Sequence, residues 1–228
     1  MAERALWAGP GVHLRAGAVG VVEFALHPGG YVRFEDDDYL LVAIPRAPRG
    51  PLSLLVTGLH KSPLSPGDRA EITADELRVG ALRVDLTRLA TPVHATPAHA
   101  VAGPAHLAPP AHAVAAPAHL AAALAAAPAP PASLRPGLRA LSAGDLPAAL
   151  ACLAGRGEGL TPAGDDVLAG FAAARHRAGR PVSFDASRCS PLGRAYLRCA
   201  ERGQLPEDLS RWGSSSGTAM LWGMGAAA

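Results

Sequence analysis

Aromatic residues are scarce in this sequence, at 4% of 228 residues, although hydrophobic residues make up 49%. Much of the hydrophobic content is alanine, which buries little surface, so a core must be built mainly from leucine and valine. A chain of this length can still form one large core or two smaller ones. We expect two domains.

Lysine and excess charge of either sign are also nearly absent. Lys61 is the single lysine among 21 basic residues, and the formal net charge is only +2. No run of basic residues with interleaved aromatic residues occurs. The sequence therefore predicts no nucleic-acid partner.

Cysteines and long hydrophobic runs are few as well. Cys152, Cys189 and Cys199 form no C-x-x-C motif and are odd in number, which is typical of a reducing cytosol. No apolar run reaches the ~20 residues that a membrane helix needs, and the first residues lack the pattern of a secretory signal. We expect a cytoplasmic protein with no membrane partner.

Residues 1–92 have the pattern of a β domain. Apolar and β-branched residues fill 17–26, and the run YLLVAI at 39–44 predicts a strand that is buried on both faces. Residues 68–86 alternate in polarity around tight turns. The pattern predicts a small antiparallel domain, either a barrel or a sandwich.

Residues 93–132 are rich in alanine, proline and histidine. Residues 97–109 and 110–122 match at 11 of 13 positions, which indicates a tandem duplication. The repeated P-A-H unit places histidines at His99, His106, His112 and His119. Their spacing keeps no fixed face, and duplication of one P-A-H unit explains them, so a linker or surface excursion is favoured over a metal site.

Residues 133–228 have a helical pattern, which completes an α+β fold class. Asp145 and Ser190 are predicted helix caps, the latter followed by proline. Leu192, Tyr196 and Cys199 follow at the spacing of one inward helix face.

The stretch GRGEGLTPAGDDVLAG at 155–170 carries the candidate chemistry. Thr161 followed by Pro162 predicts the start of a helix that runs to about 178, and the helix dipole favours acidic residues in its first turn. A capped helix explains Asp165 and Asp166 but not the glycines Gly155, Gly157, Gly159 and Gly164. Such glycines ahead of free helix amides predict a site for a phosphate or carboxylate.

A second glycine-led segment resembles the first. AGDDVLAG at 163–170 aligns with SGTAMLWG at 216–223, so two helix starts could converge on one pocket. We therefore predict ligand contacts at Gly157, Gly159, Thr161, Gly164, Ser216, Gly217 and Thr218, with Asp165 and Asp166 as catalytic residues. Because two aspartates repel an anion, a metal such as Mg²⁺ or a substrate amine would have to intervene; no metal ligand set is predicted.

The motif GLTPAGDDVLAG resembles the G-L-T-P-S-G-D-D-x-L-x-G motif of a bacterial family. That family includes the third subunit of oxamate carbamoyltransferase, an enzyme of anaerobic allantoin breakdown. The strand LSLLVTG at 52–58 and the closing G-x-x-S-G-T motif are also similar. The resemblance implies a subunit that acts with two partner proteins to transfer a carbamoyl group between a small amide or ureido acid and phosphate, with carbamoyl phosphate as an anionic substrate.

Several positions depart from the family pattern, including GAVGVV at 17–22, which lacks an expected His-Ser pair. The second family motif reads G-H-T-S-G-x-D, whereas this chain has Ser214 and Ala219 at the histidine and aspartate positions. Ala163 stands where serine is usual. Each change removes or weakens a group that could move protons or bind metal. A non-catalytic subunit that binds a small carboxylate, or serves as a scaffold, is therefore the alternative function.

Overall fold

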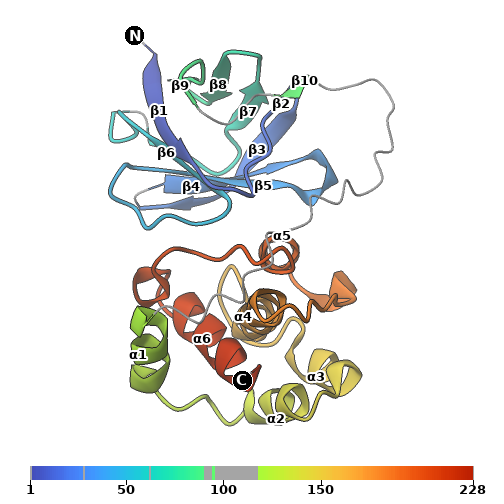
Figure 1. The fold of residues 1–228 in the computed structure, drawn as a ribbon. Coiled ribbons are helices and arrows are strands. Elements are labelled where there is room, and N and C mark those ends of the chain that lie inside the picture. Colours follow the sequence, from blue (N-terminus) through green and yellow to red (C-terminus); the bar gives the residue numbers. More distant parts are fainter. Residues whose placement is uncertain (1, 28, 62, 90–93, 96–117, 228) are drawn as a thin grey trace. The chain divides into compact units, whose positions relative to one another are not determined.

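The computed structural model describes residues 2–27, 29–61, 63–89, 94–95 and 118–227. The chain divides into two compact units, one of Met1–Ala47 with Pro51–Pro110 and one of Pro48–Gly50 with Ala111–Ala228 (Figure 1). The first unit is built on strands and the second on helices, which confirms the predicted α+β class.

Eight strands of the first unit close into a barrel in the order β1-β6-β5-β4-β3-β7-β8-β9. Their bounds are β1 Glu3–Ala8, β3 Val19–Leu26, β4 Gly29–Phe34, β5 Tyr39–Ala43, β6 Ser53–Val56, β7 Arg69–Ile72, β8 Glu76–Val79 and β9 Leu82–Asp85. A separate pair joins β2 (Arg15–Ala16) to β10 (His94–Ala95), and the short 3-10 helix η1 spans Glu35–Asp37.

The barrel corrects the prediction of a purely antiparallel domain. β1 pairs with β9 in parallel and β5 pairs with β6 in parallel, while the other neighbouring strands are antiparallel. Turn signals in the sequence indicate hairpins between consecutive strands, but parallel pairs need longer connections and carry no such local signal. The closure of the barrel was therefore not predictable from these patterns.

The barrel core follows the alternation of the strands. Every residue of β5 is buried, as the run YLLVAI predicts. In the β8–β9 hairpin Leu77 lies opposite Val84 and Val79 opposite Leu82, and all four are at most 1% exposed. The interior of this unit is therefore filled by aliphatic side chains.

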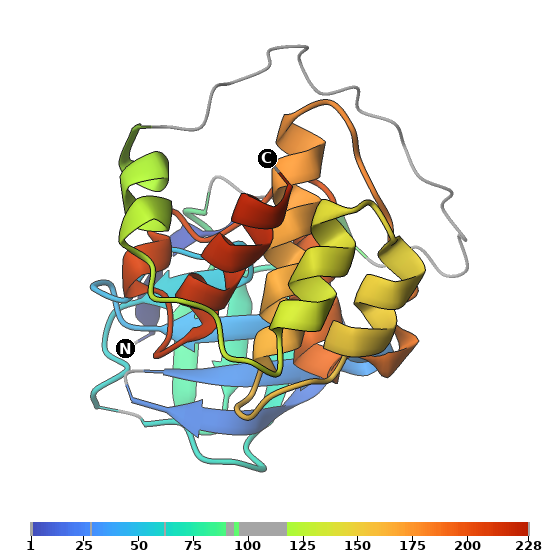
Figure 2. The ribbon, with the colours of Figure 1, turned by 90° about the horizontal axis from the view of Figure 1, so that it is seen from below.

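Six α-helices are described in the second unit. They are α1 Ala118–Ala126, α2 Arg135–Ser142, α3 Leu146–Leu153, α4 Ala163–Arg177, α5 Pro191–Ala200 and α6 Ser216–Ala226, with 3-10 turns η2 Ala186–Arg188 and η3 Leu209–Arg211. Helix α4 lies at the centre, because α3, α5 and α6 all pack on it and every residue from Gly164 to Ala173 is buried (Figure 2).

Two predicted helix caps are confirmed. The Asp145 side chain accepts a hydrogen bond from the Ala148 N–H, and the Ser190 side chain accepts one from the Gly193 N–H. The face of α5 that carries Leu192, Tyr196 and Cys199 is buried, as its spacing predicts. Local sequence signals therefore fix where α3 and α5 begin.

The predicted repeat segment 93–132 lies largely outside the described residues. His99, His106 and His112 are among those that the structure does not describe, and His119 lies in α1. Among the helices that are described, none combines the length and the apolar composition that crossing a membrane requires.

Candidate functional site

The loop between α3 and α4 turns on glycines. Gly155, Gly157 and Gly159 have φ values of 71°, 111° and 103°, in the left-handed region that other residues avoid. A Cβ atom on Gly157 would also lie 2.9 Å from the Ala163 nitrogen. The loop is exposed at Gly157 and Gly159, so the conformation of the chain itself accounts for glycine at these predicted ligand positions.

The start of α4 differs from the prediction by one residue. Pro162, not Thr161, is the N-cap, and its carbonyl accepts hydrogen bonds from the N–H groups of Asp165 and Asp166 at 2.8 and 3.2 Å. The Thr161 hydroxyl instead donates to Asp166 Oδ2 at 3.1 Å and lies 3.1 Å from Ser216 Oγ. Because Thr161 precedes the helix by two residues, its side chain reaches the carboxyl rather than the first-turn amides.

Asp165 is a buried structural acceptor. Its Oδ1 accepts from the Gly155 N–H at 2.7 Å, and its Oδ2 accepts from the N–H and the hydroxyl of Ser190 at 2.8 and 3.0 Å. The Cys189 thiol also bonds to it, and burial and the Asp165 charge raise the pKa of that thiol to about 12. Asp165 therefore ties the glycine loop and the start of α5 to α4, and it has little capacity left for a ligand.

Asp166 is also buried, but its surroundings differ from those of Asp165. Its side chain is 2% exposed, and its partners are hydroxyl groups rather than backbone amides. Burial raises the pKa of Asp166 to about 7, hydrogen bonds from Ser216 and Thr161 oppose the rise, and the nearby Asp165 charge adds to it. Near neutral pH this carboxyl is therefore present in both its protonated and its charged form.

Two of the predicted ligand glycines are explained by packing within the chain. A Cβ atom on Gly164 would lie 2.0 Å from the Leu153 carbonyl oxygen, and one on Gly217 would lie 1.8 Å from the Leu209 carbonyl oxygen. The prediction that something must approach these backbones closely is correct, but what approaches is protein backbone. Packing within the chain therefore accounts for glycine at both positions, and a ligand contact there stays a prediction.

Helices α4 and α6 cross through a second pair of glycines. A Cβ on Gly170 would meet the Met220 oxygen at 1.9 Å, and a Cβ on Gly223 would meet the Val167 oxygen at 1.9 Å. Positions 167 and 170 align with 220 and 223 in the similarity between the two segments. Each aligned glycine thus contacts the other helix at the residue aligned with its own helix's contact residue. The sequence similarity between 163–170 and 216–223 therefore reflects equivalent packing positions on α4 and α6.

The same crossing brings the two helix starts together. Thr161 and Ser216 meet through their hydroxyls, and both are half-buried, as is Thr218. Among the described residues, the N–H groups of Ala163, Ser216 and Thr218 have no hydrogen-bond partner. The arrangement offers two hydroxyls and three unpaired N–H donors beside a buried carboxyl, which can bind an anion and exchange a proton.

Magnesium fits this donor set poorly. Asp165 already accepts hydrogen bonds on both oxygens, which leaves little of its carboxylate for a metal. No group of three or more histidine, cysteine or acidic side chains in the described part of the chain could hold a metal ion. We therefore derive no step that uses a metal.

The sequence did not single out Ser190 as part of this site. Its position before Pro191 indicated only a helix start, yet its N–H and hydroxyl both bond to Asp165, 25 residues away. Arg156 is exposed in the glycine loop. No local pattern links Ser190 to Asp165, because the link depends on how α5 packs on α4.

Part of the chain matches a known protein family. Residues 153–211 match the family model described as oxamate carbamoyltransferase subunit AllH, over the glycine loop, α4 and α5. No curated protein and no solved structure matches the chain. The resemblance drawn from the sequence is therefore confirmed for residues 153–211, which are similar to the family of oxamate carbamoyltransferase subunit AllH.

Proposed function

We propose that this chain, with two partner subunits in the cytoplasm, transfers a carbamoyl group between a small amide or ureido acid and phosphate. The observation that carries the proposal is the position of Asp166, a carboxyl with a pKa of about 7 that lies behind the hydroxyls of Thr161 and Ser216. The family assignment supplies the reaction class. The hydroxyls are the groups that touch substrate, and Asp166 acts through them.

Anion binding falls to the two helix starts. The unpaired N–H groups of Ala163, Ser216 and Thr218 suit the carboxylate of the acid or the phosphate, because helix starts carry partial positive charge. Repulsion by the acidic pair is reduced, because hydrogen bonds from Gly155 and Ser190 stabilise the Asp165 charge and Asp166 is partly protonated. This removes the need for an intervening metal or amine.

Proton transfer falls to the hydroxyl and carboxyl pair. When a phosphate oxygen bonds to the carbamoyl carbon, the bond from that carbon to the amide nitrogen breaks and the nitrogen takes up a proton. The Thr161 hydroxyl can give this proton and recover one from Asp166. In the opposite direction the Asp166 carboxylate receives the proton from the amide through Thr161. A pKa near the working pH suits both directions.

The alternative is a non-catalytic subunit that binds a small carboxylate. Ala219 is fully buried at the position where the family pattern has aspartate, so the start of α6 has no carboxyl of its own. Ser214, at the histidine position, is exposed. In this function the unpaired N–H groups hold the ligand, while Asp165 and Asp166 shape the loop.

The two functions separate in one experiment. Asp166→Asn keeps an acceptor for Thr161 but cannot titrate, so turnover of oxamate and carbamoyl phosphate with the partner subunits should fall by about 100-fold or more. Binding of each compound, measured by the rise in melting temperature, should persist. Asp185→Asn, at an exposed aspartate of the same unit, is the matched control.

The pH profile of turnover adds a second criterion. The wild-type profile should change near pH 7, where Asp166 titrates, and the Asp166→Asn profile should not. Wild-type turnover in the variant would remove Asp166 from the mechanism. Ligand stabilisation without turnover in the wild type, with the partners present, would establish the alternative.

A further inference from the structure

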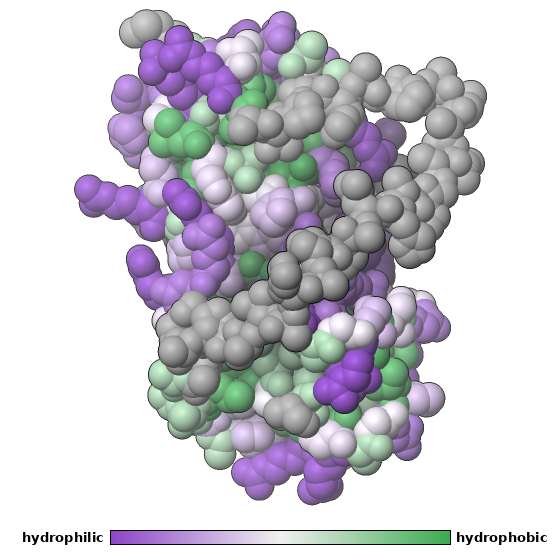
Figure 3. All heavy atoms as spheres, in the orientation of Figure 1, coloured by the Kyte–Doolittle hydropathy of each residue, from purple (hydrophilic) through white to green (hydrophobic). Residues whose placement is uncertain are grey.

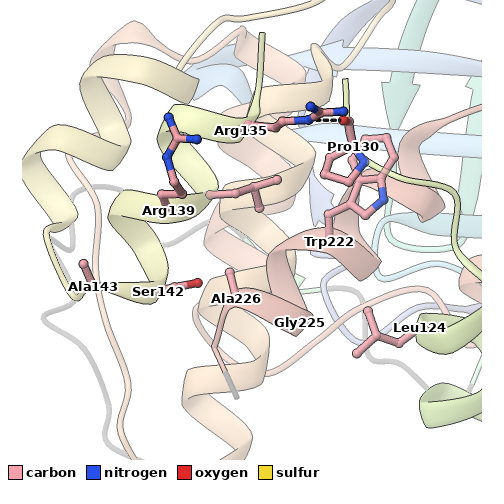
Figure 4. Close-up of a pocket in the computed structure, with 10 residues that line it drawn as sticks. Leu124, Pro130, Arg135, Arg139, Ser142, Ala143, Trp222, Gly225 and Ala226 are labelled. Atoms are coloured by element: carbon pink, nitrogen blue, oxygen red, sulfur yellow. Dashed lines mark hydrogen bonds between the residues drawn. The ribbon is translucent and has the colours of Figure 1, made fainter. Parts of the chain in front are cut away.

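A groove opens at the end of α6 that is opposite Ser216. It has a volume of about 700 Å³ and lies between α1, α2 and the last turns of α6 (Figure 4). Its apolar lining includes Leu124, Leu138 and Trp222, and its polar lining includes Arg135, Arg139 and Ser142. None of these residues belongs to the site at Thr161.

Two hydrogen bonds fix the walls of the groove. The Trp222 indole N–H donates to the Pro128 carbonyl at 2.7 Å, and Arg135 Nε donates to the Pro130 carbonyl at 3.0 Å. Both acceptors lie in the segment that joins α1 to α2. The indole ring and the α1–α2 connection are therefore held in place, so the groove is a formed feature of this unit.

The charged side chains that line the groove are all positive. No residue that lines it is acidic, and α1, α2 and α6 contain no aspartate or glutamate. Arg135 occupies the first turn of α2, where the helix dipole disfavours positive charge. Arg139 follows one turn later, and among the described residues its guanidinium has no partner. Arg139, and the terminal N–H groups of Arg135 that its bond to Pro130 does not use, are thus available to an acidic group from outside.

The shape favours a protein segment over a small ligand. Small-ligand pockets enclose most of the ligand surface, whereas this groove is largely open to its surroundings. Residues 122–126 of α1 are alanine and leucine and are exposed or half-buried, in accord with the green surface beside the grey atoms in Figure 3, so apolar surface continues beyond the groove. The family is that of a subunit, which implies other subunits for it to bind.

We propose that this groove binds an amphipathic helix of a partner subunit, with apolar side chains against Leu138 and Trp222 and acidic side chains against Arg135 and Arg139. Helices dock in grooves through side chains spaced three or four residues apart. The two arginines are four residues apart on α2, so they match acids at similar spacing. This inference rests on the family assignment and is independent of the proposed role of Asp166.

The test is a charge reversal in the purified full chain. Arg139→Glu should weaken the affinity for the purified partner subunits by at least tenfold in calorimetric titration, because it replaces attraction by repulsion. Arg180→Glu reverses an exposed charge beyond α4 and should change the affinity by less than twofold. Circular dichroism of each variant establishes that the chain is folded.

A cross-link identifies the occupant. A photoreactive amino acid in place of Ser142 should attach to a segment of a partner subunit that alternates apolar and acidic residues at helical spacing. Unchanged affinity of folded Arg139→Glu, cross-linking to a second copy of this chain, or the absence of any complex in the wild type would each overturn the proposal. Asp166→Asn should bind the partners like the wild type, so failure of the proposed chemistry is a separate result.

Discussion

Replacing Asp166 by asparagine should stabilise the protein at neutral and alkaline pH. In the folded state the carboxyl has a pKa of about 7, against an ordinary value of 3.8, because burial disfavours its charge. As the pH rises from 3.8 to 7, the unfolded chain releases this proton before the folded chain does. The contribution of Asp166 to stability is therefore complete below 3.8 and is lost progressively up to about pH 7.

The size of the effect follows from the two pKa values. One unit of pKa corresponds to about 1.4 kcal/mol, so the whole displacement costs the wild type about 4 kcal/mol above pH 7. Between pH 4.5 and pH 8 the expected change is about 3 kcal/mol. Asparagine does not titrate. The free energy of unfolding of Asp166→Asn, minus that of the wild type, should therefore increase by about 3 kcal/mol as the pH rises from 4.5 to 8.

Urea unfolding at a series of pH values measures this difference. In a Trp7→Phe background the fluorescence comes from Trp212 and Trp222, both in the helical unit. The control is Asp185→Asn: the backbone N–H of Ser187 lowers the pKa of Asp185, so its titration falls below the range and its difference from the wild type should be flat. A flat difference for Asp166→Asn as well would refute the reasoning, since it would mean that Asp166 is charged throughout.

Two further predictions concern packing and thiol chemistry. Gly223→Ala would place a Cβ 1.9 Å from the Val167 oxygen and should lower the free energy of unfolding by about 1–3 kcal/mol or more. Gly225→Ala is the control on the same helix, because its Cβ would meet only the flexible Leu124 side chain; similar urea midpoints for the two variants would contradict the close contact of α4 and α6 at their glycines. At pH 8 a disulfide reagent should modify the half-buried Cys152 first, because burial raises the pKa of Cys189 to about 12 and Cys199 is also buried. Rapid labelling of folded Cys152→Ser would contradict this prediction, since it would show that the other two thiols are accessible.

Much of the local structure was predictable from the sequence. Alternation and turns indicated the strands of the barrel, and Asp145 and Ser190 marked the starts of α3 and α5. The parallel strand pairs were not predictable, and neither was the N-cap at Pro162 in place of Thr161. The features that were predictable depend on neighbours within a few residues, while those that were not depend on contacts between distant segments.

The sequence by itself determined that glycine loops precede α4 and α6 and that Asp165 and Asp166 begin α4. Only the tertiary structure decided what those residues do. It brings Ser190 to Asp165, which satisfies that carboxylate, and it places Asp166 behind Thr161, where water is excluded. Two adjacent aspartates thus acquire different roles, because the free energy of a charge depends on its surroundings in space, and a sequence does not specify those surroundings.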